Sequence, residues 1–220
     1  MMADNNLFAL VARFARSMLS GAVLSGGKST RMGEEKGLAL LAGEPLVSRV
    51  ARVLDSVADE VVVAVAPGEA TRYRQALGDH YAIAEDERPE MGPIQGLITA
   101  LGTARGEYVL TSPCDTPFLR VEVCRSIVSL SKRRDGAVPR VGQDFEPLHG
   151  VYRRLKCLAA FEEALEEGKH KPVDAYPSLD IEYVDDDVIR VLDPHLESFW
   201  NLNTPEDLMK AELRLRSMRR

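Results

Sequence analysis

The chain has 220 residues, of which 45% are hydrophobic and 28% charged, a balance typical of a globular protein with a full hydrophobic core. Its formal net charge of -6 argues against a general nucleic-acid coat, which needs dense positive charge. The three cysteines lack C-x-x-C spacing, so a disulfide framework or a zinc site is a poor explanation of the chain, and a reducing cytoplasm fits. We therefore expect a cytoplasmic protein that does not bind nucleic acid.

Residues 1–19 precede the first predicted strand, and their apolar side chains recur at helical spacing. The apolar positions are Leu7, Leu10, Val11, Phe14, Ala15 and Met18. Arg13 interrupts this run, which is too short to span a membrane and lacks the cleavage-type end of a signal peptide. We expect a helical N-terminal extension over residues 1–19, a single domain over residues 20–220, and no membrane association.

The apolar strand predicted at residues 22–24 runs directly into a stretch rich in glycine and cations, S-G-G-K-S-T-R-M-G-E-E-K-G at residues 25–37. Glycine permits turns that point consecutive backbone N–H groups into one concavity. Lys28, Arg31 and Lys36 can add charge-assisted hydrogen bonds to an anion. The stretch therefore predicts a phosphate-binding loop. A solvated surface loop is the alternative, which the buried strand immediately before it disfavours.

Two common phosphate-binding motifs do not fit this stretch. In a P-loop the helix begins at the Lys-Ser pair, but Gly33 and Gly37 interrupt the residues that follow, and glycine inside a helix costs about 1 kcal/mol. That register would also place Val23 and Leu24, which favour a strand, in the phosphate cradle. The G-x-G-x-x-G dinucleotide fingerprint is absent.

Helical and strand patterns alternate through the rest of the chain. Helices are predicted at residues 46–57, 68–77, 94–101, 121–130 and 156–167, with a last helix opening at the Thr204-Pro205-Glu206 cap. Strands are predicted at residues 61–65, 81–83 and 108–110, twice within 136–152, and at 181–184 and 188–191. The alternation predicts an α/β fold with a mostly parallel sheet covered on both faces, and ligands beyond the carboxyl ends of its strands.

The loop and its flanks, L-S-G-G-K-S-T-R-M-G-E-E-K at residues 24–36, resemble the L-x-G-G-x-S-x-R-M-G-x-x-K signature of nucleotidyltransferases. Within that superfamily the chain most resembles the molybdenum cofactor guanylyltransferase family. The resemblance implies a three-layer, Rossmann-like nucleotidyltransferase fold. It also implies a nucleotide-binding role for the residues at the turn and catalytic roles for two cations. These residues are Leu24, Ser25, Gly26 and Gly27 at the turn, with Arg31 and Lys36 as the cations, Lys36 also binding the nucleotide.

Asp115 is the predicted metal ligand. It follows the strand at 108–110 within P-C-D-T-P, where two prolines stiffen the loop. Magnesium prefers oxygen ligands and often takes only one or two carboxylates from a protein. An aspartate between prolines can instead accept turn hydrogen bonds. The P-C-D-x-P sequence also resembles the family's metal-binding element, which implies catalytic, nucleotide-binding and Mg²⁺-binding roles for Asp115.

Two further elements match the family. Asp86 precedes a G-P-x-x-G element at residues 92–96, and the resemblance implies that it contacts the nucleoside; a solvated acidic cluster is the alternative. Asn203, in the N-x-N-T-P element at residues 201–205, is expected to complete the metal shell, while Asn201 orients the loop. Helix capping is the alternative for both asparagines, but Thr204 already meets that need.

The expected acceptor side is less well marked. The run E-P-L-H-G at residues 146–150 resembles the family element that closes this side, although a structural role is the better reading of His149. Lys169 and Lys171 could meet an acceptor phosphate or form a solvated turn. The family's base-reading asparagine is missing, because Ala64 and Ala66 occupy the end of the second strand, and alanine makes no side-chain hydrogen bond.

The resemblance implies Mg²⁺-dependent transfer of GMP from GTP to the phosphate of the molybdopterin cofactor, with release of pyrophosphate. Molybdoenzymes or cofactor-delivery proteins are the partners it suggests. Cytidylyl transfer to the same cofactor is an alternative, which the Gly26-Gly27 pair disfavours because the cytidylyl branch tends to carry Ala-Gly. A sugar-phosphate nucleotidyltransferase and a non-catalytic nucleotide-binding module also remain open, and pyrophosphate release would distinguish the last of these.

Overall fold

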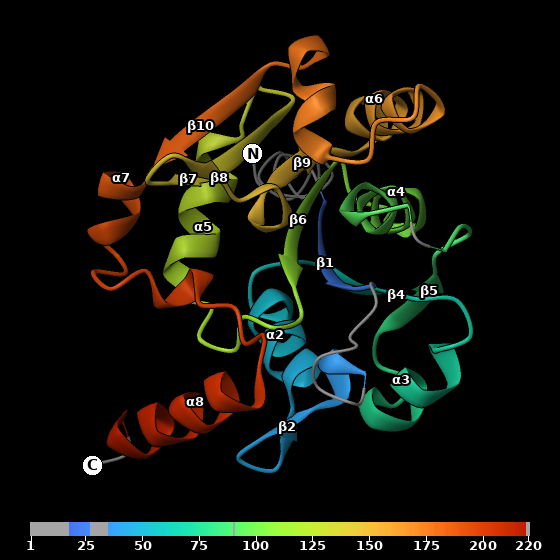
Figure 1. Cartoon of the computed structure of the whole chain (residues 1–220). Coiled ribbons are helices and arrows are strands. Elements are labelled where there is room, and N and C mark those ends of the chain that lie inside the picture. Colours follow the sequence, from blue (N-terminus) through green and yellow to red (C-terminus); the bar gives the residue numbers. More distant parts are fainter. Residues whose placement is uncertain (1–17, 27–34, 90, 219–220) are drawn as a thin grey trace, which may run out of the picture.

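The computed structural model describes residues 18–26, 35–89 and 91–218 (Figure 1). The helix expected over residues 1–19 falls almost wholly outside this range, and Leu19 already belongs to the first strand. Within the described residues, no helix has both the length and the apolar character needed to cross a membrane.

In the described part of the chain, eight strands form one sheet, in the order β10-β7-β9-β6-β1-β4-β5 with β8 paired to β7. The strands are β1 (Leu19–Ser25), β4 (Glu60–Val65), β5 (Ala82–Glu85), β6 (Tyr108–Pro113), β7 (Gly136–Val141), β8 (Asp144–Phe145), β9 (Val151–Arg153) and β10 (Ile181–Asp185). Strands β6, β1, β4 and β5 are mutually parallel, whereas β9 runs antiparallel to both its neighbours. The predicted mostly parallel sheet is confirmed.

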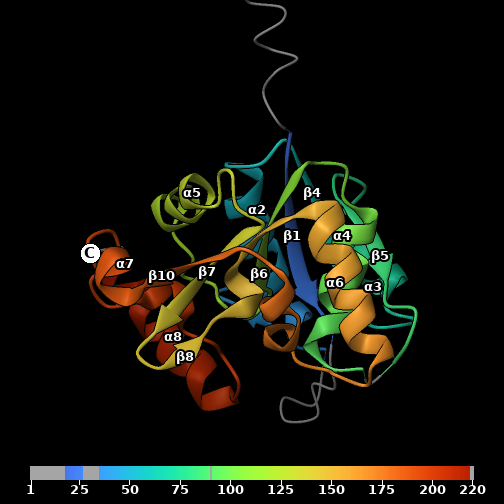
Figure 2. The same cartoon turned by 90° about the horizontal axis from the view of Figure 1, so that it is seen from above.

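Helices cover both faces of the sheet (Figure 2), which confirms the three-layer arrangement. One face packs on α4 (Pro93–Thr103) and α6 (Arg154–Glu166), and the other on α2 (Leu46–Asp55) and α5 (Val121–Leu130), with α3 (Ala70–Leu77) beside β5. The alternation within β1 explains both contacts. Ala22 and Leu24 join the α4 side of the core, and Val23 between them joins the α2 side.

The strand predicted at residues 188–191 is wrong, because α7 (Asp186–Arg190) occupies this segment. Asp186 and Asp187 lie in its first turn, where negative charge favours the helix amino terminus. Of the apolar residues in this segment, Ile189 packs into the core, whereas Val188 and Val191 are exposed. Between residues 136 and 153, β7 and β8 form the expected hairpin, but the 3-10 helix η2 (Pro147–His149) then separates β8 from β9.

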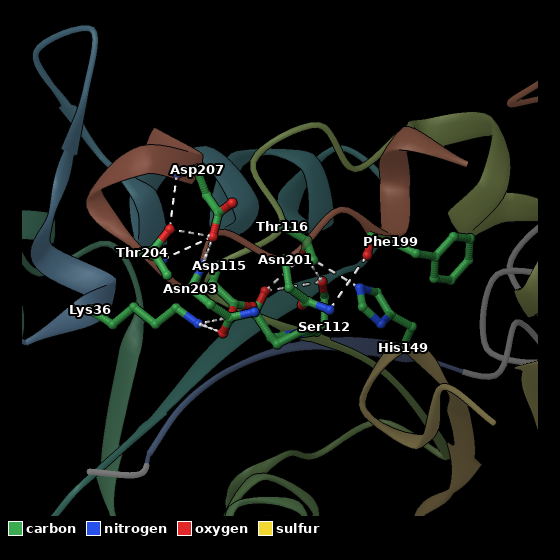
Figure 3. A network of polar contacts seen from close by, with 11 residues as sticks. Lys36, Ser112, Asp115, Thr116, His149, Phe199, Asn201, Asn203, Thr204 and Asp207 are labelled. Carbon is green, nitrogen blue, oxygen red and sulfur yellow. Dashed lines mark hydrogen bonds and ion pairs between the residues drawn. The ribbon is translucent and has the colours of Figure 1, made fainter. Parts of the chain in front are cut away.

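The last helix, α8 (Pro205–Met218), begins at the predicted cap. Thr204 Oγ1 accepts a hydrogen bond from the backbone N–H of Asp207 at 3.1 Å, and the Asp207 carboxylate accepts in turn from the backbone N–H of Thr204 at 2.9 Å (Figure 3). The helix packs beside the small hairpin of β2 (Leu40–Leu41) and β3 (Glu44–Pro45). This arrangement brings the C-terminal part of the chain back to the end of β6.

Glu197 anchors this C-terminal part to the body of the protein. Its carboxylate accepts hydrogen bonds from Arg120, at the start of α5, at 3.0 Å and from Arg214, on α8, at 2.5 Å. The Arg214 hydrogen bond outweighs burial and holds the pKa of Glu197 below its ordinary value. One carboxylate therefore connects two helices to the 3-10 helix η4 (Glu197–Phe199).

The glycine-rich stretch ends at the 3-10 helix η1 (Lys36–Leu38), which packs against the end of β1. The hydroxyl groups of Ser25 and Tyr73 form a buried hydrogen bond of 2.5 Å directly beside Gly37. A Cβ atom at Gly37 would lie 2.5 Å from the Tyr73 hydroxyl and would also clash with Ser25 Oγ. Glycine at this position is what lets the chain pass the two hydroxyls.

We expect Glu197→Gln to lower the free energy of unfolding at pH 7 by about 1–2 kcal/mol, the scale of partly exposed charged hydrogen bonds. A carboxylate with a lowered folded-state pKa stabilises the fold fully above its ordinary pKa of 4.5, and this contribution is lost as the pH falls through the folded-state pKa. The deficit measured by urea unfolding should therefore shrink below pH 4.5. Glu206→Gln, which alters an exposed pair with Lys210, is the control and should cost little. A deficit independent of pH would contradict this account.

Gly37→Ala should destabilise the fold by about 1–3 kcal/mol, because the added methyl group overpacks the site beside Ser25 and Tyr73. The matched control is Gly102→Ala within α4, where a Cβ atom meets open space. That change should be neutral or stabilise by up to about 1 kcal/mol, since alanine favours helix over glycine. Equal unfolding midpoints for the two variants would show that Gly37 is not sterically required.

Candidate active site

A cavity of about 810 Å³ lies along one edge of the sheet, in the size range of ligand pockets. Its walls include residues that follow four adjacent parallel strands: Gly26 after β1, Ala66 after β4, Asp86 after β5 and Asp115 after β6. The carboxyl ends of these strands lie at the same edge, and three strand spacings separate β6 from β5 by about 14 Å. The cavity is therefore long enough for a nucleoside together with its phosphate chain.

A polar cluster occupies the β6 end of the cavity (Figure 3). The Lys36 ammonium forms an ion pair with Asp115 Oδ2 and donates a hydrogen bond of 2.7 Å to Asn203 Oδ1. These three side chains come from η1, the loop after β6 and the approach to α8, which lie far apart in the sequence. The fold thus assembles one cation and two oxygen-bearing side chains at a single point.

Backbone hydrogen bonds fix the position of Asp115. The N–H of the preceding residue, Cys114, donates to the carbonyl oxygen of Leu24 at 3.0 Å, which ties this loop to the end of β1. The carbonyl oxygen of Asp115 itself accepts from the N–H of Leu202 at 2.9 Å, which ties the loop to the segment that carries Asn203. The residue as a whole is 8% exposed, so its placement depends on these contacts rather than on solvent.

One oxygen of Asp115 suits a metal ion. Oδ1 is buried and has no hydrogen-bond partner among the described residues, an arrangement that is costly for a carboxylate unless a ligand completes it. Within those residues, no group of three or more His, Cys, Asp and Glu side chains could hold a metal ion. A cation at Asp115 would therefore take further ligands from Asn203, phosphate oxygens and water, as Mg²⁺ commonly does.

Asp86 lies at the other end of the cavity. Thr99, on α4, donates a hydrogen bond of 2.6 Å to Asp86 Oδ1, while Oδ2 faces Gly26, where a Cβ atom would lie 2.7 Å away. Burial raises the pKa of Asp86, and the Thr99 hydrogen bond opposes this effect only in part. The glycine at the turn thus allows the backbone and the carboxylate to come close together.

Glu35 also faces the cavity, beside Lys36. Its carboxylate accepts a hydrogen bond of 3.1 Å from Tyr73, whose hydroxyl is also paired with Ser25. Burial raises the pKa of Glu35 despite this hydrogen bond. The Tyr73 hydroxyl therefore joins the side chain of Ser25, at the end of β1, to that of Glu35, the residue directly before Lys36.

The residues expected from the sequence to bind nucleotide converge where they are described. Those that line the cavity are Leu24, Ser25, Gly26, Lys36, Asp86 and Asp115. Asn203 joins them through Lys36. Gly27 and Arg31 lie outside the described residues. Ala66 lines the cavity, whereas Ala64 is buried within β4, so the end of this strand offers no side-chain hydrogen bond.

Three other residues singled out from the sequence form no hydrogen bond or ion pair with this cluster: His149 and Lys169, expected on the acceptor side, and Asn201, expected to orient its loop. His149 is buried, packs edge-on against Phe199, and has a contact of 3.4 Å from Nε2 to Thr116 Oγ1. Asn201 donates to the carbonyl oxygen of Phe199 at 3.4 Å, an orienting contact within its own loop. Lys169 is exposed and pairs with Glu167. His149 is therefore held by packing and one weak polar contact, while its Nδ1 is buried 3.7 Å from Glu146 Oε2 without a hydrogen bond among the described residues.

Four residues were not singled out from the sequence: Glu35 and Gln95, which line the cavity, and Tyr73 and Thr99, which hydrogen-bond to its wall residues. Tyr73 looks like one more apolar position of α3, and its pairing with Ser25 spans 48 residues. Gln95 lies inside the G-P-x-x-G element, and Thr99 follows it four residues later. This i, i+4 spacing, which places both side chains on one face of a helix, was the only signal in the sequence that they could interact.

Comparisons with known proteins agree with this geometry. The family model described as "MobA-like NTP transferase domain" matches residues 21–180. A relative from Natronomonas pharaonis is 38% identical over 198 residues, covering 89% of this chain and 98% of the relative. Another, from Pelotomaculum thermopropionicum, is 37% identical over 194 residues, covering 88% and 92%. Both carry the name "Probable molybdenum cofactor guanylyltransferase".

A solved structure has the same fold. The crystal structure of molybdopterin-guanine dinucleotide biosynthesis protein A from Archaeoglobus fulgidus aligns with a TM-score of 0.76 and 24% identity, covering 91% of this chain and all of that one. The expected nucleotidyltransferase fold is therefore confirmed. With the family model matching most of its length, the chain is a nucleotidyltransferase that belongs to the MobA-like NTP transferase family.

Proposed function

We propose that the protein transfers GMP from GTP to the phosphate of the molybdopterin cofactor and releases pyrophosphate. The observation that carries this proposal is the single cavity shared by Lys36, Asp115, the β1 turn and Asp86. Relatives at 31–38% identity bear the name molybdenum cofactor guanylyltransferase, which supports the choice of donor and acceptor.

In this reaction an oxygen of the acceptor phosphate attacks the α-phosphorus of GTP, the bond from that phosphorus to the bridging oxygen of the β-phosphate breaks, and pyrophosphate leaves with the electron pair. The attacking phosphate is already largely ionised at neutral pH, since its second pKa is about 6. No serine, cysteine or histidine nucleophile is needed. Catalysis then consists of positioning the two substrates and neutralising their charge.

The residues of the cluster have distinct roles in the proposal. Lys36, held by Asp115 and Asn203, neutralises phosphate charge and stabilises pyrophosphate as it leaves. The backbone at Gly26 approaches the phosphate chain, and Asp86 contacts the nucleoside at the far end. Arg31, carried over from the resemblance, adds a second cation at the phosphates, as Gly27 adds backbone N–H groups.

Magnesium fits the β6 end. The unpartnered Oδ1 of Asp115 and the amide oxygen of Asn203 are the groups that would hold it. When bound, the ion would supply positive charge to the phosphate oxygens at the reacting phosphorus. The contribution of the chain itself is to hold these two oxygens beside Lys36 through the Leu202 and Cys114 backbone bonds.

The direct test offers each of the four nucleoside triphosphates, with magnesium and molybdopterin cofactor, to the full chain. We expect pyrophosphate and a dinucleotide product from GTP alone. Exclusive use of CTP would overturn the guanine assignment and leave the reaction class standing. Absence of pyrophosphate release with every triphosphate would overturn the proposed activity.

Lys36→Ala and Asp115→Ala should each lower the turnover number by about 10²–10³, the usual effect of removing one preorganised electrostatic group. Pyrophosphate release at saturating GTP is the measurement, with thermal unfolding to confirm that the variants fold. Lys210→Ala is the matched control, because it removes an exposed lysine of α8 that pairs only with Glu206 among the described residues. Near-normal turnover by either site variant would refute its assigned role.

A further inference from the structure

The Asp86 end of the cavity has to recognise a base without a side chain from β4. Ala66 and Pro67 line the wall at the end of this strand, and neither side chain can form a hydrogen bond. Among the other described polar residues of this end, Glu69 is committed to an ion pair with Arg72, and Arg88 is exposed. Gln95 and Asp86 remain as wall residues that can offer fixed polar atoms.

Thr99 links these two side chains in a chain of hydrogen bonds. Gln95 Nε2 lies 3.3 Å from Thr99 Oγ1, which lies 2.6 Å from Asp86 Oδ1. An ionised carboxylate only accepts, so the single hydroxyl proton of Thr99 must point to Asp86. Thr99 must then accept from Gln95, which fixes the NH₂ end of the carboxamide toward Thr99. Because Gln95 is 4% exposed, its amide has little freedom to turn.

This arrangement leaves a definite set of polar atoms unused. Asp86 Oδ2 and Gln95 Oε1 are acceptors, and the second N–H of Gln95 is a donor. No hydrogen bond joins any of them to another described residue. Neither oxygen is among the buried atoms without a partner, so both are accessible from the cavity that their residues line. Asp86 Oδ2 also faces the glycine turn, where Gly26 has no side chain to cover it. Asp86 and Gln95 together thus offer two acceptors and one donor, held on α4 and on the loop after β5.

Guanine is the base that matches this set. Its Watson–Crick edge carries two donors, N1–H and the 2-amino group, and one acceptor, O6. Cytosine and uracil each present one donor and two acceptors, and adenine one donor and one acceptor. A mismatched base would leave a buried carboxylate or amide oxygen unpaired, which is the costly outcome that gives polar sites their selectivity.

We infer that Gln95 reads the guanine edge together with Asp86, and that Thr99 is the positioning residue that fixes both side chains for this task. The inference rests on the proposed function and names the residues that select its donor nucleotide. It assigns to α4 the base recognition that the β4 end cannot supply through side chains. Lys36 and Asp115 take no part in this base recognition. Substitutions at Gln95 and Thr99 can therefore change the nucleotide preference without changing the turnover number.

The test compares Thr99→Val and Gln95→Leu with the parent protein, using GTP, CTP and ITP, which lacks the 2-amino group. Equilibrium binding of each nucleotide with magnesium and without acceptor is measured beside steady-state pyrophosphate release. We expect each variant to raise the KM for GTP about tenfold with kcat within about twofold, and to reduce the GTP-over-ITP preference by a similar factor. Thr99→Ser, which keeps the hydroxyl, should restore both values.

Thr103→Val is the matched control, since Thr103 is an exposed threonine of the same helix and should change nothing. If the parent transfers GMP but Thr99→Val and Gln95→Leu keep its nucleotide preference, the inference is wrong and the proposed function stands. If the parent does not use GTP, the proposed function fails and the inference fails with it. A fall in kcat without loss of preference would also overturn it, because Thr99 and Gln95 would then serve only the fold or the chemistry.

Discussion

The ion pair between Lys36 and Asp115 is the interaction on which the site depends. It joins the exit of the glycine-rich stretch to the loop after β6, and Asn203 extends it to the C-terminal part of the chain. A lysine and a carboxylate this close offset each other's electric field, while the ammonium remains partly exposed at the cavity and Asp115 Oδ1 keeps no hydrogen-bond partner among the described residues. A phosphate chain would compete with Asp115 for the same cation. In the proposed reaction, substrate binding would therefore exchange Asp115 for a phosphate as the ionic partner of Lys36.

The sheet holds apart the two regions of the cavity that the proposal assigns to phosphate binding and to base recognition. The loop after β6 holds the charged end, where Lys36 and Asp115 lie, and the loop after β5 holds Asp86, whose Oδ2 reaches toward Gly26 after β1 between them. Because the strands are parallel and hydrogen-bonded in a fixed register, the distance between these ends is set by the sheet and not by side-chain flexibility. Helix α4 contributes Gln95 and Thr99 to one end only, so changes there can alter recognition without disturbing the phosphate end.

Much of this organisation could be predicted from the sequence, because it depends on local pattern. The strand and turn at residues 22–27, the P-C-D-T-P loop and the Thr204 cap are contiguous signals, and all the described ones lie where expected. The segment at residues 188–191 was misjudged because V-I-R-V suits a strand by composition, while the two acids before it favour a helix start. Tyr73 and Thr99 were missed for another reason. Each forms a hydrogen bond with a residue distant in the sequence, and the local spacing of apolar and polar residues does not predict such contacts.

The hydrogen bond from Leu202 N–H to the Asp115 carbonyl has a consequence for how the site comes into being. The nucleotide turn, the Asp86 loop and the Asp115 loop are all present in the first 120 residues, yet Asn203 arrives only after the whole sheet has been made. During synthesis, the cavity residues Lys36, Asp86 and Asp115 are therefore made before the Asn203 amide that accepts a hydrogen bond from Lys36. Because Glu197 and α8 also follow β10, the segment that completes this polar cluster is the same one that joins α5 to the C-terminal helix.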